Sequence, residues 1–181
     1  MTLDEIFSEL SAHFIKGLMF HDQMSNYFDF LQLQGYSRCH EYHFKAESNN
    51  YKKLNRYYLN HYNKFIPEQR VEDPNVIPDS WYKYSRFDVD VTTKKNAVGS
   101  AINKWVSWER STKELLERMY CELLDLNEIS SAIFLQDFIK DVDDELKYAE
   151  RKHLDLVSVD YDMTYILEEQ KKIHDKYKSM L

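Results

Sequence analysis

The stretch PEQRVEDPNVIP, residues 67–78, contains all three prolines of the chain. Proline lacks the backbone N–H that a helix interior uses, and Asp and Asn favour turns. We therefore interpret residues 65–92 as one long irregular connection. This connection divides the 181 residues into two halves, and each half carries a helical pattern.

The half before the connection predicts a helical hairpin. Apolar residues recur at steps of three and four from Leu10 to Leu31, which indicates one long amphipathic helix over residues 4–32. Gly35 is the expected break after this helix. A second helix is expected over residues 36–64.

The half after the connection predicts a second hairpin. Thr92 or Thr93 can cap a third helix over residues 93–125. Asn127 then interrupts the pattern, and a fourth helix is expected over residues 128–156.

Together these patterns predict an all-α protein. The connection is long enough to return along a whole helix, so the two hairpins fit an antiparallel four-helix bundle with one long crossover connection. A charged fifth helix is expected at the C-terminal end, over residues 162–180. We expect residues 1–181 to form a single domain, because this length suits one hydrophobic core.

Composition argues against several classes of function. The formal net charge of −7 is unlike that of a protein built for the phosphate backbone, so nucleic acid is not an expected partner. Three glycines cannot build a glycine-rich phosphate loop, and two cysteines form neither a zinc-finger pattern nor a disulfide framework. The acidic N-terminal residues and the lack of a long apolar stretch predict a cytoplasmic protein without a membrane segment.

Acidic residues on the apolar stripes are the candidates for chemistry. Crossover bundles host metal sites made of carboxylates and histidines that project inward from facing helices. Glu109 follows Trp105 by four residues and Glu145 follows Val142 by three, so both glutamates are expected to point inward. Glu47 is the corresponding acid on the second expected helix.

Histidines add to this set. His13, His21, His40 and His43 all lie on the first expected hairpin. His43 precedes Glu47 by one helical turn, and antiparallel packing is expected to bring His21 toward His43. We expect His13 to lie on the surface. Oxygen and imidazole ligands together suit iron, manganese or zinc.

At these residues the chain resembles the ferritins, particularly the non-haem bacterial type, over nearly its whole length. The resemblance is carried by the stretch from Gly35 to Tyr58, by the triplet around Glu109 and, most closely, by FLQDFIKDVDDE at residues 134–145. It implies oxidation of ferrous iron at a paired-metal site and storage of the product inside a hollow shell of many subunits.

The resemblance can be carried over one position at a time. Three positions keep the family's glutamate, namely Glu47, Glu109 and Glu145. Three have lost the family's glutamate, histidine and glutamine, namely Phe14, Asn50 and Val142. Because paired-metal oxidation needs both ions bound, we expect weak or no ferroxidase activity. The charged fifth helix is also unlike the helix that closes the family's shell, so a dimer is a more plausible assembly than a cage.

Two functions stay open at this point. In the first, one ion of iron, manganese or zinc is held by the three glutamates, with Asn50 as a weak oxygen donor and His21 and His43 nearby. In the second, no metal is bound and the two histidines hydrogen-bond the glutamates instead. The bundle would then be a scaffold that acts by binding another protein.

Overall fold

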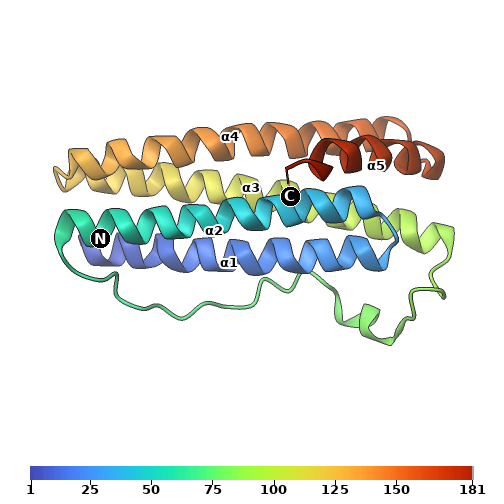
Figure 1. Cartoon of the computed structure of the whole chain (residues 1–181), viewed down its shortest axis with the longest axis horizontal. Coiled ribbons are helices and arrows are strands. Elements are labelled where there is room, and N and C mark those ends of the chain that lie inside the picture. Colours follow the sequence, from blue (N-terminus) through green and yellow to red (C-terminus); the bar gives the residue numbers. More distant parts are fainter. Residues whose placement is uncertain (181) are drawn as a thin grey trace.

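The computed structural model describes residues 1–180, and within them all regular structure is helical (Figure 1). The helices are α1 (Leu3–Phe30), α2 (Gln34–Tyr62), the short 3-10 helix η1 (Asp79–Lys83), α3 (Val91–Asp125), α4 (Ile129–Ser158) and α5 (Met163–Lys178). The expected fold class, a four-helix bundle with a crossover and an additional C-terminal helix, is confirmed. The helix ends lie no more than two residues from the expected positions.

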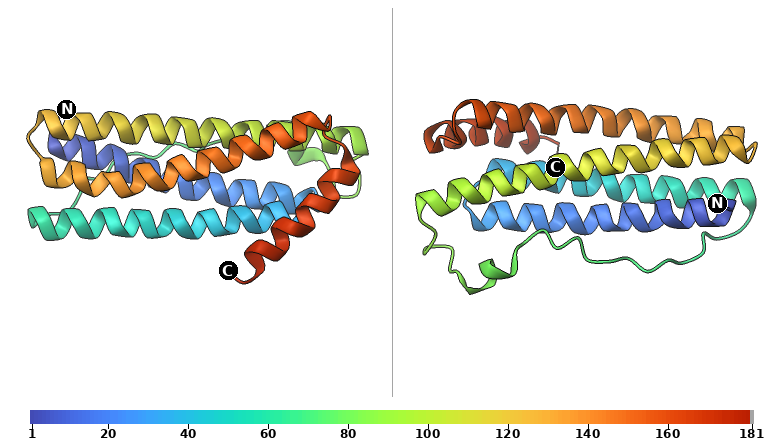
Figure 2. Two further views of the ribbon diagram at one scale, coloured as in Figure 1. Left: turned by 90° about the horizontal axis from the view of Figure 1, so that it is seen from above. Right: turned by 180° about the vertical axis from the view of Figure 1, so that it is seen from behind.

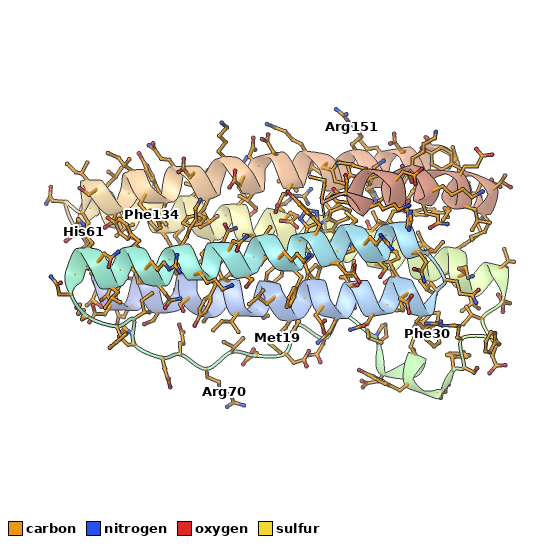
Figure 3. All side chains as sticks on the ribbon, viewed as in Figure 1. Met19, Phe30, His61, Arg70, Phe134 and Arg151 are labelled. Carbon is orange, nitrogen blue, oxygen red and sulfur yellow. The ribbon has the colours of Figure 1, made fainter. Side chains whose placement is uncertain are left out.

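The four long helices form two antiparallel hairpins, α1 with α2 and α3 with α4, and the connection runs the length of the bundle along α1 (Figure 1). This connection is tied to the bundle on both sides. The side chain of Gln23 on α1 accepts a hydrogen bond from the backbone N–H of Val76 at 2.8 Å. Lys104 on α3 donates to the carbonyl oxygen of Val76 at 2.6 Å. Further along, Trp81 of η1 packs edge-on against Phe30, which is labelled in Figure 3.

Helix starts are set by local capping. Thr2 and Glu5 form a capping box at α1, in which each side chain accepts a hydrogen bond from the other residue's backbone N–H. At α3 the cap is Asp90, whose carboxylate accepts from the N–H of Thr93 at 2.7 Å. The expectation of a threonine cap at 92 or 93 is therefore wrong, because a stronger capping residue precedes them.

The break between α1 and α2 lies three residues earlier than expected. Gln32 adopts a left-handed conformation with φ 63°, and it reverses the chain there. Gly35 instead lies in the first turn of α2, so the prediction that it is the break is wrong.

α5 folds back diagonally across α2 (Figure 2), and Gly35 makes this possible. A Cβ atom on Gly35 would lie 1.8 Å from the backbone carbonyl oxygen of Gln170, so only glycine fits. The contact is reinforced by buried Glu169, which accepts from the hydroxyl of Tyr36 and from Lys152, both at 2.5 Å. The exposed face of α5 is therefore charged, and its buried face is anchored to the bundle.

Two apolar clusters fill the bundle, one toward each end. The cluster that includes Phe7, Phe14 and Val142 lies at the end where Phe134, labelled in Figure 3, stacks on Tyr57 with ring centroids 3.9 Å apart. The other cluster includes Trp105 and Trp108 and extends to α5. Helices α1 to α5 include no segment long and apolar enough to cross a membrane.

Candidate metal centre

The three expected glutamates come together between the two apolar clusters. Glu47 on α2 is 6% exposed, and Glu109 on α3 is fully buried. The side chain of Glu145 on α4 is 27% exposed. Each of the three carboxylates interacts electrostatically with the other two. Three acidic side chains from three helices thus face one another in the middle of the bundle.

Glu47 packs against the backbone of α1 at Gly17, which has no side chain. A Cβ atom on Gly17 of α1 would be 3.0 Å from both Cδ and Oε1 of Glu47, so the missing side chain leaves room for this carboxyl. Its Oε2 is buried without a hydrogen-bond partner among the described residues. Burial, and then the charges of Glu145 and Glu109, raise the pKa of Glu47 well above its usual value.

Glu109 is held by one strong bond. The indole N–H of Trp105 donates to Glu109 Oε1 at 2.8 Å, and Nε2 of His21 lies 3.7 Å from the same oxygen. The second oxygen, Oε2, is buried and unpartnered within the described chain. Burial, and then the charge of Glu145, raise the pKa of Glu109 to about 8.

Glu145 pairs with His43 at the edge of the site. The distance from His43 Nδ1 to Glu145 Oε1 is 3.3 Å. Burial disfavours the charged imidazole, but the Glu145 carboxylate and hydrogen bonds with Cys39 and Glu145 raise the pKa of His43 well above its usual value. This pair is the point at which the buried acids meet a positive charge.

A groove of about 550 Å³ between α2, α4 and α5 leads to this edge. His43 and Glu145 line it, and so do Asn50 and two further acids, Asp141 and Asp144. Asn50 is half-buried there, so its side chain lies beside the entrance to the site.

Two of the positions that differ from ferritins are filled with apolar core. The ring of Phe14 packs on Phe138 with centroids 5.3 Å apart, and Val142 belongs to the same cluster. Neither side chain can donate to a metal.

The structure places all three inner histidines of the first hairpin in the core. His21 and His43, both expected, are joined by His40, which is named among the candidate histidines of the sequence but is not assigned there to the metal ligands. The available signal was the spacing of three between His40 and His43, which puts both on one helix face. His13 is not a free surface residue: it stacks on Trp108 at 4.7 Å and hydrogen-bonds Thr112 at 2.8 Å.

Unsatisfied polar atoms gather here. Six of the buried side-chain atoms without a hydrogen-bond partner in residues 1–180 are His21 Nε2, His40 Nε2, His43 Nε2, Glu47 Oε2, Trp108 Nε1 and Glu109 Oε2. Native proteins leave few such atoms, so their accumulation in one place marks these residues as the candidate site. As the side chains stand, no three His, Cys, Asp or Glu residues of the described chain are grouped closely enough to hold a metal ion. The donor types therefore fit a metal, but binding requires side-chain rotation.

Gly17→Ala is expected to disturb this site without unfolding the bundle. The new methyl group would push on the flexible end of Glu47, which can rotate away, and would lie 3.3 Å from the ring of Trp108. Alanine also improves helix propensity by about 1 kcal/mol. Thermal unfolding should be unchanged or slightly raised, and iron affinity, measured by anaerobic titration, should fall. Unchanged iron affinity would mean that Glu47 does not bind the ion.

Comparisons with known proteins agree on the architecture. No protein-family model matches the sequence, and a search of curated proteins finds no relative. Among solved structures, a humanized archaeal ferritin aligns with a TM-score of 0.77 at 15% identity, over 94% of this chain and 93% of that one. A closed form of the Archaeoglobus fulgidus ferritin, engineered by site-directed mutagenesis, aligns with a TM-score of 0.78 at 15% identity, over 96% of each chain. The open-pore ferritin of the same hyperthermophilic archaeon aligns with a TM-score of 0.77 at 16% identity, over 93% of this chain and 92% of that one. The chain therefore has the ferritin-like fold.

Proposed function

We propose that this chain is a ferritin-like protein that binds iron at Glu47, Glu109 and Glu145 and oxidises it weakly or not at all. The observation that carries the proposal is the pair of buried, unpartnered oxygens, Oε2 of Glu47 and Oε2 of Glu109. The ferritins among the structural neighbours support iron as the ion.

A bound cation resolves an electrostatic problem in this core. Burial of an ionised carboxylate without a partner costs several kcal/mol, by order of magnitude. His43 is a positive side chain beside the acidic group, and it is already paired with Glu145. A divalent ion would offset the remaining charge, and the raised pKa values imply that Glu47 and Glu109 release protons when it binds.

Weak oxidation follows from apolar side chains at two positions where ferritins carry donors. Ferritin-type oxidation needs two ions, and Phe14 and Val142 replace two donors with hydrocarbon. Asn50 lies at the groove with a neutral amide where the resemblance expects an imidazole. The remaining carboxylates suffice for one ion.

Metal analysis tests this proposal. The protein is purified in chelator, loaded with ferrous iron without oxygen, desalted and analysed for iron, and then exposed to oxygen while oxidation is followed. We expect about one iron per chain and slow oxidation. Glu47→Gln should lose the iron, whereas Asp144→Asn, a matched change at an exposed acid of the groove, should keep it. Equal iron content in both variants would contradict the proposal.

A metal-free scaffold is the second candidate, and a specific observation favours it. No metal-ligand group is assembled among the described side chains, while Trp105 and His43 already hydrogen-bond two of the glutamates. In that case chelator leaves the melting temperature unchanged, and the surface acts by binding another protein. A large loss of thermal stability in chelator would exclude this candidate.

We also propose that residues 1–181 act as one cytoplasmic domain that self-associates as a dimer or larger assembly. α5 is anchored on α2 of its own chain through Gly35 and Glu169, which supports a small assembly rather than a closed shell. Sizing chromatography during the iron experiment measures this directly.

A further inference from the structure

Three imidazoles are stacked in the core where apolar rings would be expected. His21 and His40 are fully buried and His43 is 4% exposed. Their ring centroids are 5.2 to 6.1 Å apart, and all three Nε2 atoms lack a hydrogen-bond partner among the described residues. Buried polar atoms without partners are costly, so this cluster needs an explanation beyond packing.

The hydrogen bonds fix which nitrogens are free. Nδ1 of His21 lies 3.0 Å from Nδ1 of His40, so one ring donates and the other accepts. A neutral imidazole carries a single N–H. When Glu109 is ionised, as a metal ligand must be, its Oε1 lies 3.7 Å from Nε2 of His21 and favours the N–H on that nitrogen. His21 Nδ1 must then accept from His40, and His40 Nε2 is left with a bare lone pair in the core.

A single carboxylate contact determines which nitrogen of His43 is free. The Glu145 carboxylate faces Nδ1 of His43 at 3.3 Å and favours the N–H on that nitrogen. Metal binding must displace the second proton of this ring, and the lone pair is then on Nε2, which is also unpartnered in the described chain. His43 is thus oriented through Nδ1 by a carboxylate, which is the usual arrangement of a metal-binding histidine, and His40 is oriented through Nδ1 by the imidazole of His21.

Spacing is compatible with one shared ion. Two imidazoles bound to a tetrahedral Zn²⁺ at about 2.1 Å have ring centroids about 5.4 Å apart. The centroids of His40 and His43, one helical turn apart on α2, are separated by 6.1 Å. The two rings are thus close enough to share one ion, but the side chains must rotate to bind it, because no three His, Cys, Asp or Glu residues of the described chain are grouped for a metal as they stand.

We propose that His40 and His43 bind a zinc ion through Nε2, that Glu109 provides the anionic ligand, and that His21 is a positioning residue. Two imidazoles with one carboxylate suit Zn²⁺ better than a set of oxygens does. This site does not rest on iron binding, although it shares Glu109 with the proposed iron site. It lies mainly on the first hairpin, on the opposite side of Glu47 from Phe14.

Zinc binding to the full chain tests the proposal. Protein stripped in chelator is titrated with Zn²⁺ and, separately, with Co²⁺, whose visible absorption reports tetrahedral coordination. We expect one ion per chain, and X-ray absorption at the zinc edge should show two imidazole ligands. His40→Phe keeps a flat ring against Phe28, so it should fold while its zinc affinity falls at least tenfold. His40→Gln is the second variant if the first fails to fold, and it should weaken zinc binding equally.

Controls separate this site from the iron site. His13→Gln changes a histidine outside the cluster and should leave zinc binding unchanged. Glu47→Gln should lose iron but keep zinc, and His40→Phe should do the reverse. For the positioning role, His21→Gln should weaken zinc about tenfold while the zinc edge still shows two imidazoles. An edge spectrum with oxygen ligands alone, no zinc bound by the wild type, or zinc affinity unchanged in both His40 variants would overturn the proposal.

Discussion

Glu109→Gln is expected to raise the free energy of unfolding of the metal-free protein at pH 9 and to leave it nearly unchanged at pH 5. Burial and the charge of Glu145 raise the pKa of Glu109 from 4.5 to about 8. Between these values the folded protein holds a proton that the unfolded chain has released. Stability therefore falls as pH rises through this window, by up to about 1.4 kcal/mol per pH unit, and levels off above it.

Glutamine removes this pH dependence because it stays neutral while it keeps an oxygen for the indole N–H of Trp105. Glu47 contributes in the same direction through its own raised pKa, so the variant should reduce the slope without abolishing it. Urea unfolding in chelator at pH 5, 7 and 9 measures the effect. Glu114→Gln, at an exposed acid on the same helix, is the matched control and should follow the wild type. If the unfolding free energy of Glu109→Gln depended on pH as strongly as that of the wild type, other groups in the folded protein would already stabilise the Glu109 carboxylate.

Gly35→Ala is expected to detach α5 from the bundle. The new Cβ atom would overlap the Gln170 carbonyl oxygen at 1.8 Å, and rotation of a side chain cannot relieve a clash between backbones. Separation also breaks the bonds from Tyr36 and Lys152 to Glu169. Buried Ile166, Ile173 and Tyr177 would become exposed. We expect a loss of about 3 kcal/mol or more, at the upper end of overpacking effects.

Limited proteolysis and hydrogen exchange localise this loss. Backbone amides of α5 should exchange quickly in the variant while those of α1 remain protected. Gly99→Ala is the matched control, because its Cβ would meet only the side chain of Tyr161 at 3.3 Å. Protected amides throughout α5 in Gly35→Ala would mean that the two backbones can separate without undocking the helix.

The fold could be predicted because its determinants are local. The apolar steps from Leu10 to Leu31 and the prolines between 67 and 78 indicate helices and their connection within a few residues of sequence. The role of Gly35 could not be predicted in this way, since it depends on the backbone of Gln170, 135 positions later. A glycine near a turn and a glycine under a crossing helix look the same in sequence.

The site was predictable in part for the same reason. The inward positions of Glu109 and Glu145 follow from helical spacing. In the structure Glu109 is fully buried and the side chain of Glu145 is 27% exposed. His40 was harder to place, because its partner is His21 on another helix and the bond between them depends on the register of the hairpin. His13 was misplaced because stacking on Trp108 of α3 depends on how the two hairpins meet. Metal binding by any of these residues stays a prediction.

The division of the polar core between the hairpins has a consequence for the order of folding. The three inner histidines and Glu47 belong to α1 and α2, whereas Glu109 and Glu145 belong to α3 and α4. Contacts within a hairpin are local and form early, and contacts between hairpins are slower because the chain must close a longer loop. The imidazoles can therefore come together in a nascent first hairpin before either carboxylate from the second arrives. Docking of the second hairpin, with the connection fastened by Gln23 and Lys104, is the step that brings negative charge to a nitrogen cluster already in place.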